Sequence, residues 1–136
     1  MKTIDDYFSS LTRFLRKHKS IVGIEPEYPY LRITDHFGRV NARLHFFDGS
    51  YLDIDEMIRI GGGSAINYNY RYHYQRPQGP VITYDDTPHH PELETFPYHA
   101  HPYRSGTRET APHEKITVTE VIRKILEELS TNPPPG

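Results

Sequence analysis

Four of the nine histidines in this 136-residue chain crowd into one stretch, which runs from Tyr84 to His101 and reads YDDTPHHPELETFPYHAH. Imidazole titrates near neutral pH and is a common metal ligand, so the stretch suits either proton transfer or metal binding. Its prolines disfavour both a helix interior and a central strand. A long connection with its own ionisable groups is typical of a functional loop, and we predict one here. The four histidines are His89, His90, His99 and His101.

Proton transfer also needs partners, and these lie on the segments before the loop. Arg71 and His73 occupy the polar side of an alternating segment, and Asp85 ends the next segment. If the two segments pair around the turn at Pro77–Pro80, His73 and Asp85 lie within a few residues of facing each other. An imidazole can then act as base or acid towards a ribose 2′-hydroxyl or a leaving oxygen, and a guanidinium can stabilise phosphate charge.

Each residue of the predicted catalytic site therefore has an expected role. We expect His73 or His89 to act as base and acid, Arg71 to bind phosphate and Asp85 to orient a histidine. Tyrosine rings stack on unpaired bases, so tyrosines near the site are candidates for substrate contact. The full prediction is Arg71, His73, Asp85, His89 and His90 as catalytic residues, with Tyr72, Tyr84, His99 and His101 as substrate-binding residues.

A metal site is the alternative use of the same loop. His99 and His101 are separated by one residue, so both side chains project from the same side of an extended chain. Three histidines with a carboxylate suit Zn²⁺ or another borderline metal, although the spacing matches no specific metal motif. The main hypothesis requires no cofactor. The alternative is Zn²⁺ or another divalent metal bound by His89, His90, His99 and His101.

Composition narrows the class of protein. A net charge of −2 does not favour a nucleic-acid binder, but it leaves room for a local basic face. The absence of cysteine excludes disulfides and Cys-ligated zinc. No apolar run approaches the roughly 18 to 20 residues that span a bilayer, and the N-terminal residues lack the apolar middle of a signal peptide. We therefore expect a cytoplasmic protein that does not associate with membranes.

Two helices are predicted, one near each end of the chain. Thr3 and Asp6 form a capping box for the first helix, which should end near Lys19. Thr117 and Glu120 form a second capping box before a strongly amphipathic closing helix. We expect residues 102–114 to be irregular and residues 132–136 to be a disordered tail.

Between the helices the hydrophobic period changes to two, which indicates strands. A three-residue loop at Asp48–Ser50 would pair Phe46 with Leu52 and Leu44 with Ile54. Glu56 falls on the apolar face in that register, opposite Ala42. A carboxylate there either lies at the rim of the sheet or is buried with a partner, and a buried one would have a raised pKa. The polar face places Arg43 across from Asp55 and His45 across from Asp53. The predicted strands are Tyr30–Thr34, Val40–Phe47, Tyr51–Ile60, Ala65–Gln75 and Val81–Asp85.

Tight turns between these strands exclude the crossover helices that parallel pairs require. The predicted fold is therefore α+β: an antiparallel meander of four or five strands, with the N-terminal and C-terminal helices on one face and the long His- and Pro-rich loop before the last helix. Residues 1–131 should form a single domain. The open edges of a meander invite dimerisation or pairing with a partner.

Four short motifs recur in the order and at the separations of a known family. They resemble those of the TumE-type toxins of prokaryotic toxin–antitoxin pairs, which were once grouped as a domain of unknown function. That family more often has YDNAPHH and FPHHKH in the last two motifs, so Asp86, Thr87 and Tyr98 depart from its pattern. The motifs are FFDGSYLDIDE (Phe46–Glu56), YHYQ (Tyr72–Gln75), YDDTPHHPEL (Tyr84–Leu93) and FPYHAH (Phe96–His101).

This resemblance implies a small cytoplasmic toxin neutralised by an antitoxin, often a helix-turn-helix DNA-binding protein. Most such toxins act against RNA or translation. The leading hypothesis is thus a toxin that acts as an endoribonuclease-like enzyme through His, Arg and Asp acid–base chemistry. The alternatives are a metal-dependent nuclease or phosphotransferase that uses the His-rich loop, and a non-enzymatic domain that binds only its partner.

Overall fold

The N-terminal helix has the predicted start and a shorter end. The computed structural model describes residues 1–88 and 90–131; His89 and the predicted tail, residues 132–136, lie outside the described residues. Helix α1 spans Ile4–Arg16, and the capping box between Thr3 and Asp6 is formed. The amides of Lys17 and His18 reach back only three residues, so the helix tightens and ends before Lys19.

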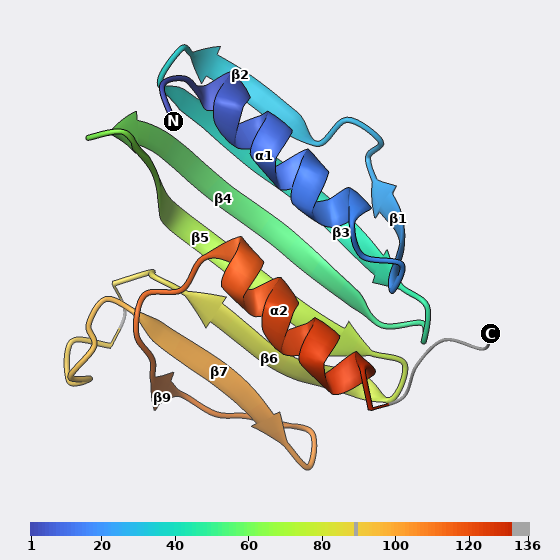
Figure 1. The fold of residues 1–136 in the computed structure, drawn as a ribbon. Helices are drawn as coiled ribbons and strands as arrows, with labels where there is room; N and C mark the ends of the chain where they lie inside the picture. The colour runs from blue at the N-terminus through green and yellow to red at the C-terminus, as the bar shows by residue number, and fades with distance from the viewer. Residues whose placement is uncertain (89, 132–136) are drawn as a thin grey trace.

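The closing helix, α2, spans Val118–Leu129 and begins at the predicted capping box of Thr117 and Glu120. Both helices lie on the same face of one large antiparallel sheet (Figure 1). Their apolar residues join those of the sheet in a single core. The predicted α+β class is therefore confirmed. The buried helix residues are Ile4, Phe8 and Leu11 of α1 and Val118, Val121, Ile122, Ile125 and Leu129 of α2.

The sheet is larger than predicted. It has nine strands in the described residues, in the order β1-β3-β4-β5-β6-β7-β8, with β2 also on β3 and β9 also on β7. Residues 102–114 are predicted to be irregular because their side chains are mostly polar. Three strands, β7 to β9, nevertheless include parts of this segment. The strands are β1 (Ile21–Glu25), β2 (Tyr30–Thr34), β3 (Phe37–Phe46), β4 (Tyr51–Gly61), β5 (Ser64–Arg76), β6 (Gly79–Asp85), β7 (His99–Arg104), β8 (Thr107–Arg108) and β9 (Ala111–Pro112).

The β3–β4 hairpin has the predicted faces but a register two residues away from the prediction. Leu44 pairs with Leu52, and Arg43 pairs with Asp53. The amide of Phe46 bonds the carbonyl of Ser50, so the three-residue loop lies one residue earlier in the chain than predicted. The side chain and amide of Ser50 both donate to Asp48 Oδ1, and these bonds stabilise the turn in this position. The shift also places Glu56 opposite Val40 rather than Ala42, Asn41 rather than Arg43 across from Asp55, and His45 across from Tyr51.

A bulge in β5 breaks the predicted alternation of that strand. Asn69 has a φ of 47°, and the pairing of β4 with β5 shifts at this point. Asp86 stabilises the bulge, because its carboxylate accepts hydrogen bonds from the amides of Asn69 and Tyr70 at 2.9 Å each. Before the bulge the faces exchange, so that Asn67 is buried and Tyr68 is only half-buried.

Helix α1 approaches the sheet closely over Gly38. A Cβ atom at this position would lie 2.6 Å from Ile4 Cγ1 and 2.9 Å from the carbonyl oxygen of Leu31. Any larger residue would therefore push the helix away from β3.

Among the described residues, no helix is long and apolar enough to cross a membrane.

Candidate functional site

Two rows of polar residues cross the face of the sheet that the helices leave uncovered, which we call the open face. In the first row, Asp55 of β4 pairs with Arg71 of β5, Arg71 with Asp85 of β6, and Asp85 with His99 of β7. Side chains alternate between the two faces of a strand, so residues paired in this way share a face. The second row consists of Asp53, His73, Thr83 and His101.

Asp85 lies between two imidazoles on this face. Its Oδ1 is 2.7 Å from His99 Nε2, and its Oδ2 is 3.6 Å from His101 Nε2. The His90 ring, from the segment between β6 and β7, packs against both rings, with centroid distances of 5.0 Å to His99 and 5.8 Å to His101. Asp85, His99 and His101 are at most 6% exposed although they lie outside the helical core. We call these four residues the Asp85 cluster.

Backbone carbonyls fix the orientation of both strand histidines. His99 Nδ1 is 2.8 Å from the carbonyl oxygen of Pro97, and His101 Nδ1 is 2.9 Å from that of Glu109. A carbonyl only accepts hydrogen bonds, so each Nδ1 carries a hydrogen and donates it. In the neutral ring, each Nε2 therefore carries a lone pair and no hydrogen. Burial favours the neutral form of His101, because it lowers the pKa of this imidazole below its ordinary value.

The contact of His99 with Asp85 is close but poorly directed. Although the two atoms are 2.7 Å apart, the N–H direction at Nε2 misses Oδ1, and this buried atom has no hydrogen-bond partner among the described residues. Oδ1 itself accepts a hydrogen bond from the amide of Thr87 at 3.0 Å. A buried polar atom without a well-directed partner is rare in native proteins and calls for an explanation.

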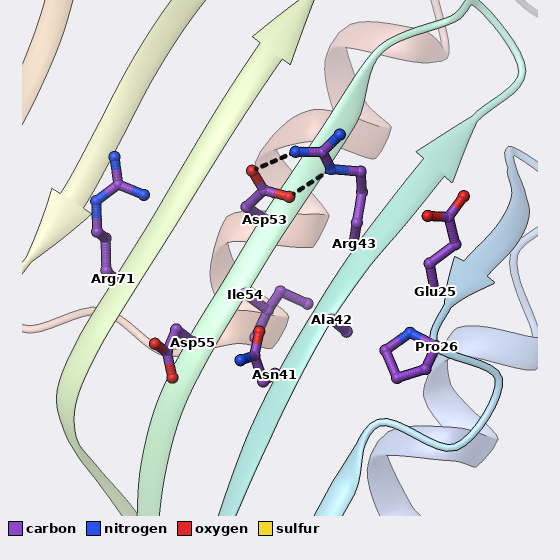
Figure 2. A pocket seen from close by; sticks show the side chains of 9 residues that line it. All are labelled: Glu25, Pro26, Asn41, Ala42, Arg43, Asp53, Ile54, Asp55 and Arg71. Carbon is purple, nitrogen blue, oxygen red and sulfur yellow. Dashed lines mark hydrogen bonds and ion pairs between the residues drawn. The ribbon is translucent and has the colours of Figure 1, made fainter.

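Arg71 lies beside the cluster and lines a neighbouring groove on the open face (Figure 2). Its two neighbours in the row are both carboxylates, but Asp55 is bound by Arg39 at 2.9 Å and Asp85 faces the histidines. Within the described part of the chain, the Arg71 guanidinium makes no hydrogen bond or ion pair. An exposed guanidinium without a carboxylate partner remains available to an anionic ligand. The groove is also lined by Glu25, Pro26, Asn41, Ala42, Arg43, Asp53 and Ile54.

His73 uses both ring nitrogens within its own neighbourhood. Nδ1 is 2.7 Å from the hydroxyl of Thr83, and Nε2 is 3.0 Å from Oε1 of Gln75. Thr83 separates His73 from His101 in the second row. His73 therefore lies near the Asp85 cluster without joining it.

The two predicted substrate-binding tyrosines, Tyr72 and Tyr84, lie on the helix-covered face of the sheet. Tyr72 is 0% exposed and Tyr84 is 6% exposed. Tyr72 instead donates a hydrogen bond to Glu56 at 2.6 Å, and Tyr7 of α1 donates to the other oxygen of the same carboxylate. Tyr84 packs against the ring of His113. The structure does not bring these tyrosines together with the rest of the predicted site.

Glu56 is the second buried carboxylate of the molecule, and its surroundings differ from those of Asp85. Asn67 supports the arrangement, because its Nδ2 donates to the Tyr72 hydroxyl at 2.9 Å and to the carbonyl of Ile116 at 2.8 Å. Burial raises the pKa of Glu56 from 4.5 to about 7, although the two tyrosine hydroxyls oppose this shift. We call Glu56, Tyr7, Tyr72 and Asn67 the Glu56 network.

The structure thus gathers part of the predicted site. It brings Asp85, His90, His99 and His101 together, with Arg71 as the neighbour of Asp85 and His73 one row away. His89, a predicted catalytic residue, lies outside the described residues. Sequence reasoning missed the carbonyls that orient the histidines, which have no sequence signal, and Thr83, whose type is common in strands.

Comparison with known proteins gives one match. A family model described as Toxin TumE matches residues 11–132, which is most of the chain. No curated protein and no solved structure matches.

Proposed function

Because this chain belongs to the TumE toxin family, it is the toxin of a toxin–antitoxin pair, and we propose that it acts by cutting RNA. The family implies a cognate antitoxin as partner. We further propose that this antitoxin is a helix-turn-helix DNA-binding protein and that the toxin acts in the cytoplasm, where RNA is accessible.

One observation carries the RNA hypothesis: the guanidinium of Arg71, which has no partner among the described residues, lies next to a buried cluster of imidazoles and a carboxylate. In the row across the sheet, Arg71 is the immediate neighbour of Asp85, and Asp85 is the neighbour of His99. Cleavage of a phosphodiester needs a cation for the phosphate and groups that move protons near neutral pH. Arg71 also lines the groove on the open face, so a phosphate that enters the groove can reach its guanidinium.

The proposed reaction is an intramolecular phosphoryl transfer. The ribose 2′-hydroxyl loses its proton to the Asp85 cluster and attacks the adjacent phosphorus, while Arg71 neutralises the phosphate charge. The bond from phosphorus to the 5′-oxygen breaks, and this oxygen takes up a proton. The products are a 2′,3′-cyclic phosphate and a free 5′-hydroxyl. Because His73 uses both ring nitrogens within the sheet, we assign the acid and base functions to the cluster first and to His73 second.

The test compares isosteric changes at the two buried carboxylates. Asp85→Asn removes a charge from the cluster and should lower RNA cleavage and growth inhibition by at least about a hundredfold. Glu56→Gln makes the same chemical change on the helix-covered face and should leave both activities within about twofold of the parent protein. The measurement is cleavage of total RNA by the purified proteins, with growth after induced expression in cells that lack the antitoxin.

Two results would contradict the proposal. Full toxicity of a folded Asp85→Asn protein would remove the cluster from the mechanism. Intact RNA with the purified parent protein under every condition tried, together with tight antitoxin binding, would favour a domain that acts only by binding a partner. Circular dichroism and the thermal midpoint of each variant establish that it is folded.

A further inference from the structure

The side chains of the Asp85 cluster converge on one point. The ligand atoms of His90, His99 and His101 lie within 4.8 Å of one another. Ligand atoms around a tetrahedral Zn²⁺ ion, with metal–ligand distances of about 2.1 Å, are about 3.4 Å apart. A movement on the order of 1 Å would therefore close these nitrogens around an ion. We propose that the cluster is a metal centre that binds one Zn²⁺-like divalent transition-metal ion through His90, His99, His101 and Asp85.

The strongest support comes from the faces that the two strand histidines turn towards Asp85. Each has its Nδ1 hydrogen bonded to a backbone carbonyl, so each Nε2 of the neutral ring carries a lone pair and no hydrogen where it lies close to the carboxylate. The distances of 2.7 Å and 3.6 Å place electron-rich atoms against one another in a buried site. A cation among them removes this repulsion and gives a ligand bond to His99 Nε2, which has no hydrogen-bond partner among the described residues.

Protonation of the two strand histidines satisfies these buried atoms less well than a metal ion does. If His99 carried a proton on Nε2, its N–H direction would still miss Oδ1. If both rings were protonated, two cations would be buried with ring centroids only 4.8 Å apart. One divalent ion satisfies both nitrogens and the carboxylate at once.

The surroundings of the cluster resemble the outer shell of established metal sites. Histidines that bind metals almost always donate their other ring N–H to a carbonyl, a carboxylate or water, and this fixes the ring. Pro97 and Glu109 supply these carbonyls here, and the amide of Thr87 orients Asp85. Three nitrogens and one oxygen suit Zn²⁺ and its neighbours rather than Mg²⁺ or Ca²⁺, which prefer oxygen ligands.

The metal centre is argued from these side chains alone, whereas its use in RNA cleavage rests on the proposed function. In that reaction a bound ion would polarise a phosphate oxygen as a Lewis acid, and His73 would take the proton of the 2′-hydroxyl in place of the metal-bound cluster. Arg71 keeps its place beside the phosphate in either case.

The experiment uses the full chain without a histidine tag. Mass spectrometry of the purified protein should find about one transition-metal ion per chain, and calorimetry of the chelator-stripped protein with Zn²⁺ should show one site. His90→Gln, a change in a half-buried segment that carries little folding risk, should weaken binding at least tenfold. His99→Gln should abolish binding. The control His45→Gln, which removes a histidine paired with Glu25 on the same face, should bind like the parent protein.

Two outcomes would overturn the metal centre: no Zn²⁺ binding by the stripped and folded parent protein, or parent-like binding by both cluster variants. The two proposals fail separately. RNA cleavage by a stripped protein that binds no Zn²⁺ would reject the metal centre and keep the proposed function. Stoichiometric binding that is lost in His99→Gln, without any RNA cleavage, would keep the metal centre and reject the function.

Discussion

Two carboxylates, Glu56 and Asp85, are buried on opposite faces of one sheet, and their hydrogen-bonding environments differ. Glu56 receives one hydroxyl donor on each oxygen, from Tyr7 and Tyr72, and is fully buried under the helices. Asp85 faces two imidazole nitrogens whose hydrogens are on the far side of the ring. The first arrangement satisfies its polar groups and stabilises the core. The second leaves one buried nitrogen, His99 Nε2, without a hydrogen-bond partner among residues 1–88 and 90–131.

The largest effect that tests this comparison is the pH dependence of stability due to Glu56. Its pKa is about 7 in the folded protein against an ordinary 4.5, so the folded state binds the proton more tightly than the unfolded state. The associated stability is fully present below about pH 4.5 and is lost as pH rises towards 7. At about 1.4 kcal/mol per pH unit, the loss is roughly 3 kcal/mol.

Glu56→Gln keeps the size of the side chain and removes its titration. We expect urea unfolding of the parent protein and of this variant to differ between pH 5 and pH 8, with the variant gaining relative stability at the higher pH. A parallel pH dependence in both proteins would show that Glu56 is not the titrating group. Loss of toxicity in a folded variant would break the division between a structural and a functional carboxylate.

The tyrosine hydroxyls provide a second, smaller test. Tyr72 donates to a buried carboxylate, whereas Tyr74 donates to the neutral hydroxyl of Ser50 at 3.1 Å. Hydrogen bonds to charged groups contribute about 1.5–3 kcal/mol and neutral ones about 0.5–1.5 kcal/mol. At pH 8, Tyr72→Phe should therefore lower the free energy of unfolding more than Tyr74→Phe. At pH 5 the two losses should become similar, because Glu56 is then protonated; equal losses at pH 8 would contradict the account.

The sequence predicts the two faces of the sheet to different extents. Glu56 was placed on the apolar face by strand alternation alone, and the raised pKa follows from that burial. Its partner Tyr72 is predicted to bind substrate because tyrosines stack on bases, although the same alternation places it on the face opposite Arg71 and His73. The contribution of Asn67 requires the bulge at Asn69, which has no local sequence signal, because Asp86, which stabilises the bulge, lies just after the following strand.

The Asp85 cluster was only partly predictable for a different reason. The residue types and the His99-x-His101 spacing indicated a site, and the resemblance pointed to the same stretch. However, the sequence predicts a loop where strand β7 begins, because its histidines alternate with Ala100 and Pro102 and the segment lacks a large apolar face. The two-residue error in the β3–β4 register comes from the turn, which lies one residue earlier than the apolar pattern suggests and is held there by the hydrogen bonds of Ser50 to Asp48.

The smallest expected effect concerns two arginines of the open face. Arg43 has a carboxylate partner, whereas Arg71 has none among the described residues. Arg43 binds Asp53 through two nitrogens, at 2.7 Å and 3.1 Å, and both side chains are partly exposed. Such a surface pair contributes about 0.2–1 kcal/mol, so a double-mutant cycle of Arg43→Ala and Asp53→Ala should give a coupling energy in this range. Arg71→Ala breaks no ion pair in the described structure and should change the free energy of unfolding by less than about 0.5 kcal/mol. Its RNA cleavage should nevertheless fall far more than that of Arg43→Ala. A larger stability loss for Arg71→Ala than for Arg43→Ala would mean that Arg71 has a structural partner, and it would then be unavailable to phosphate.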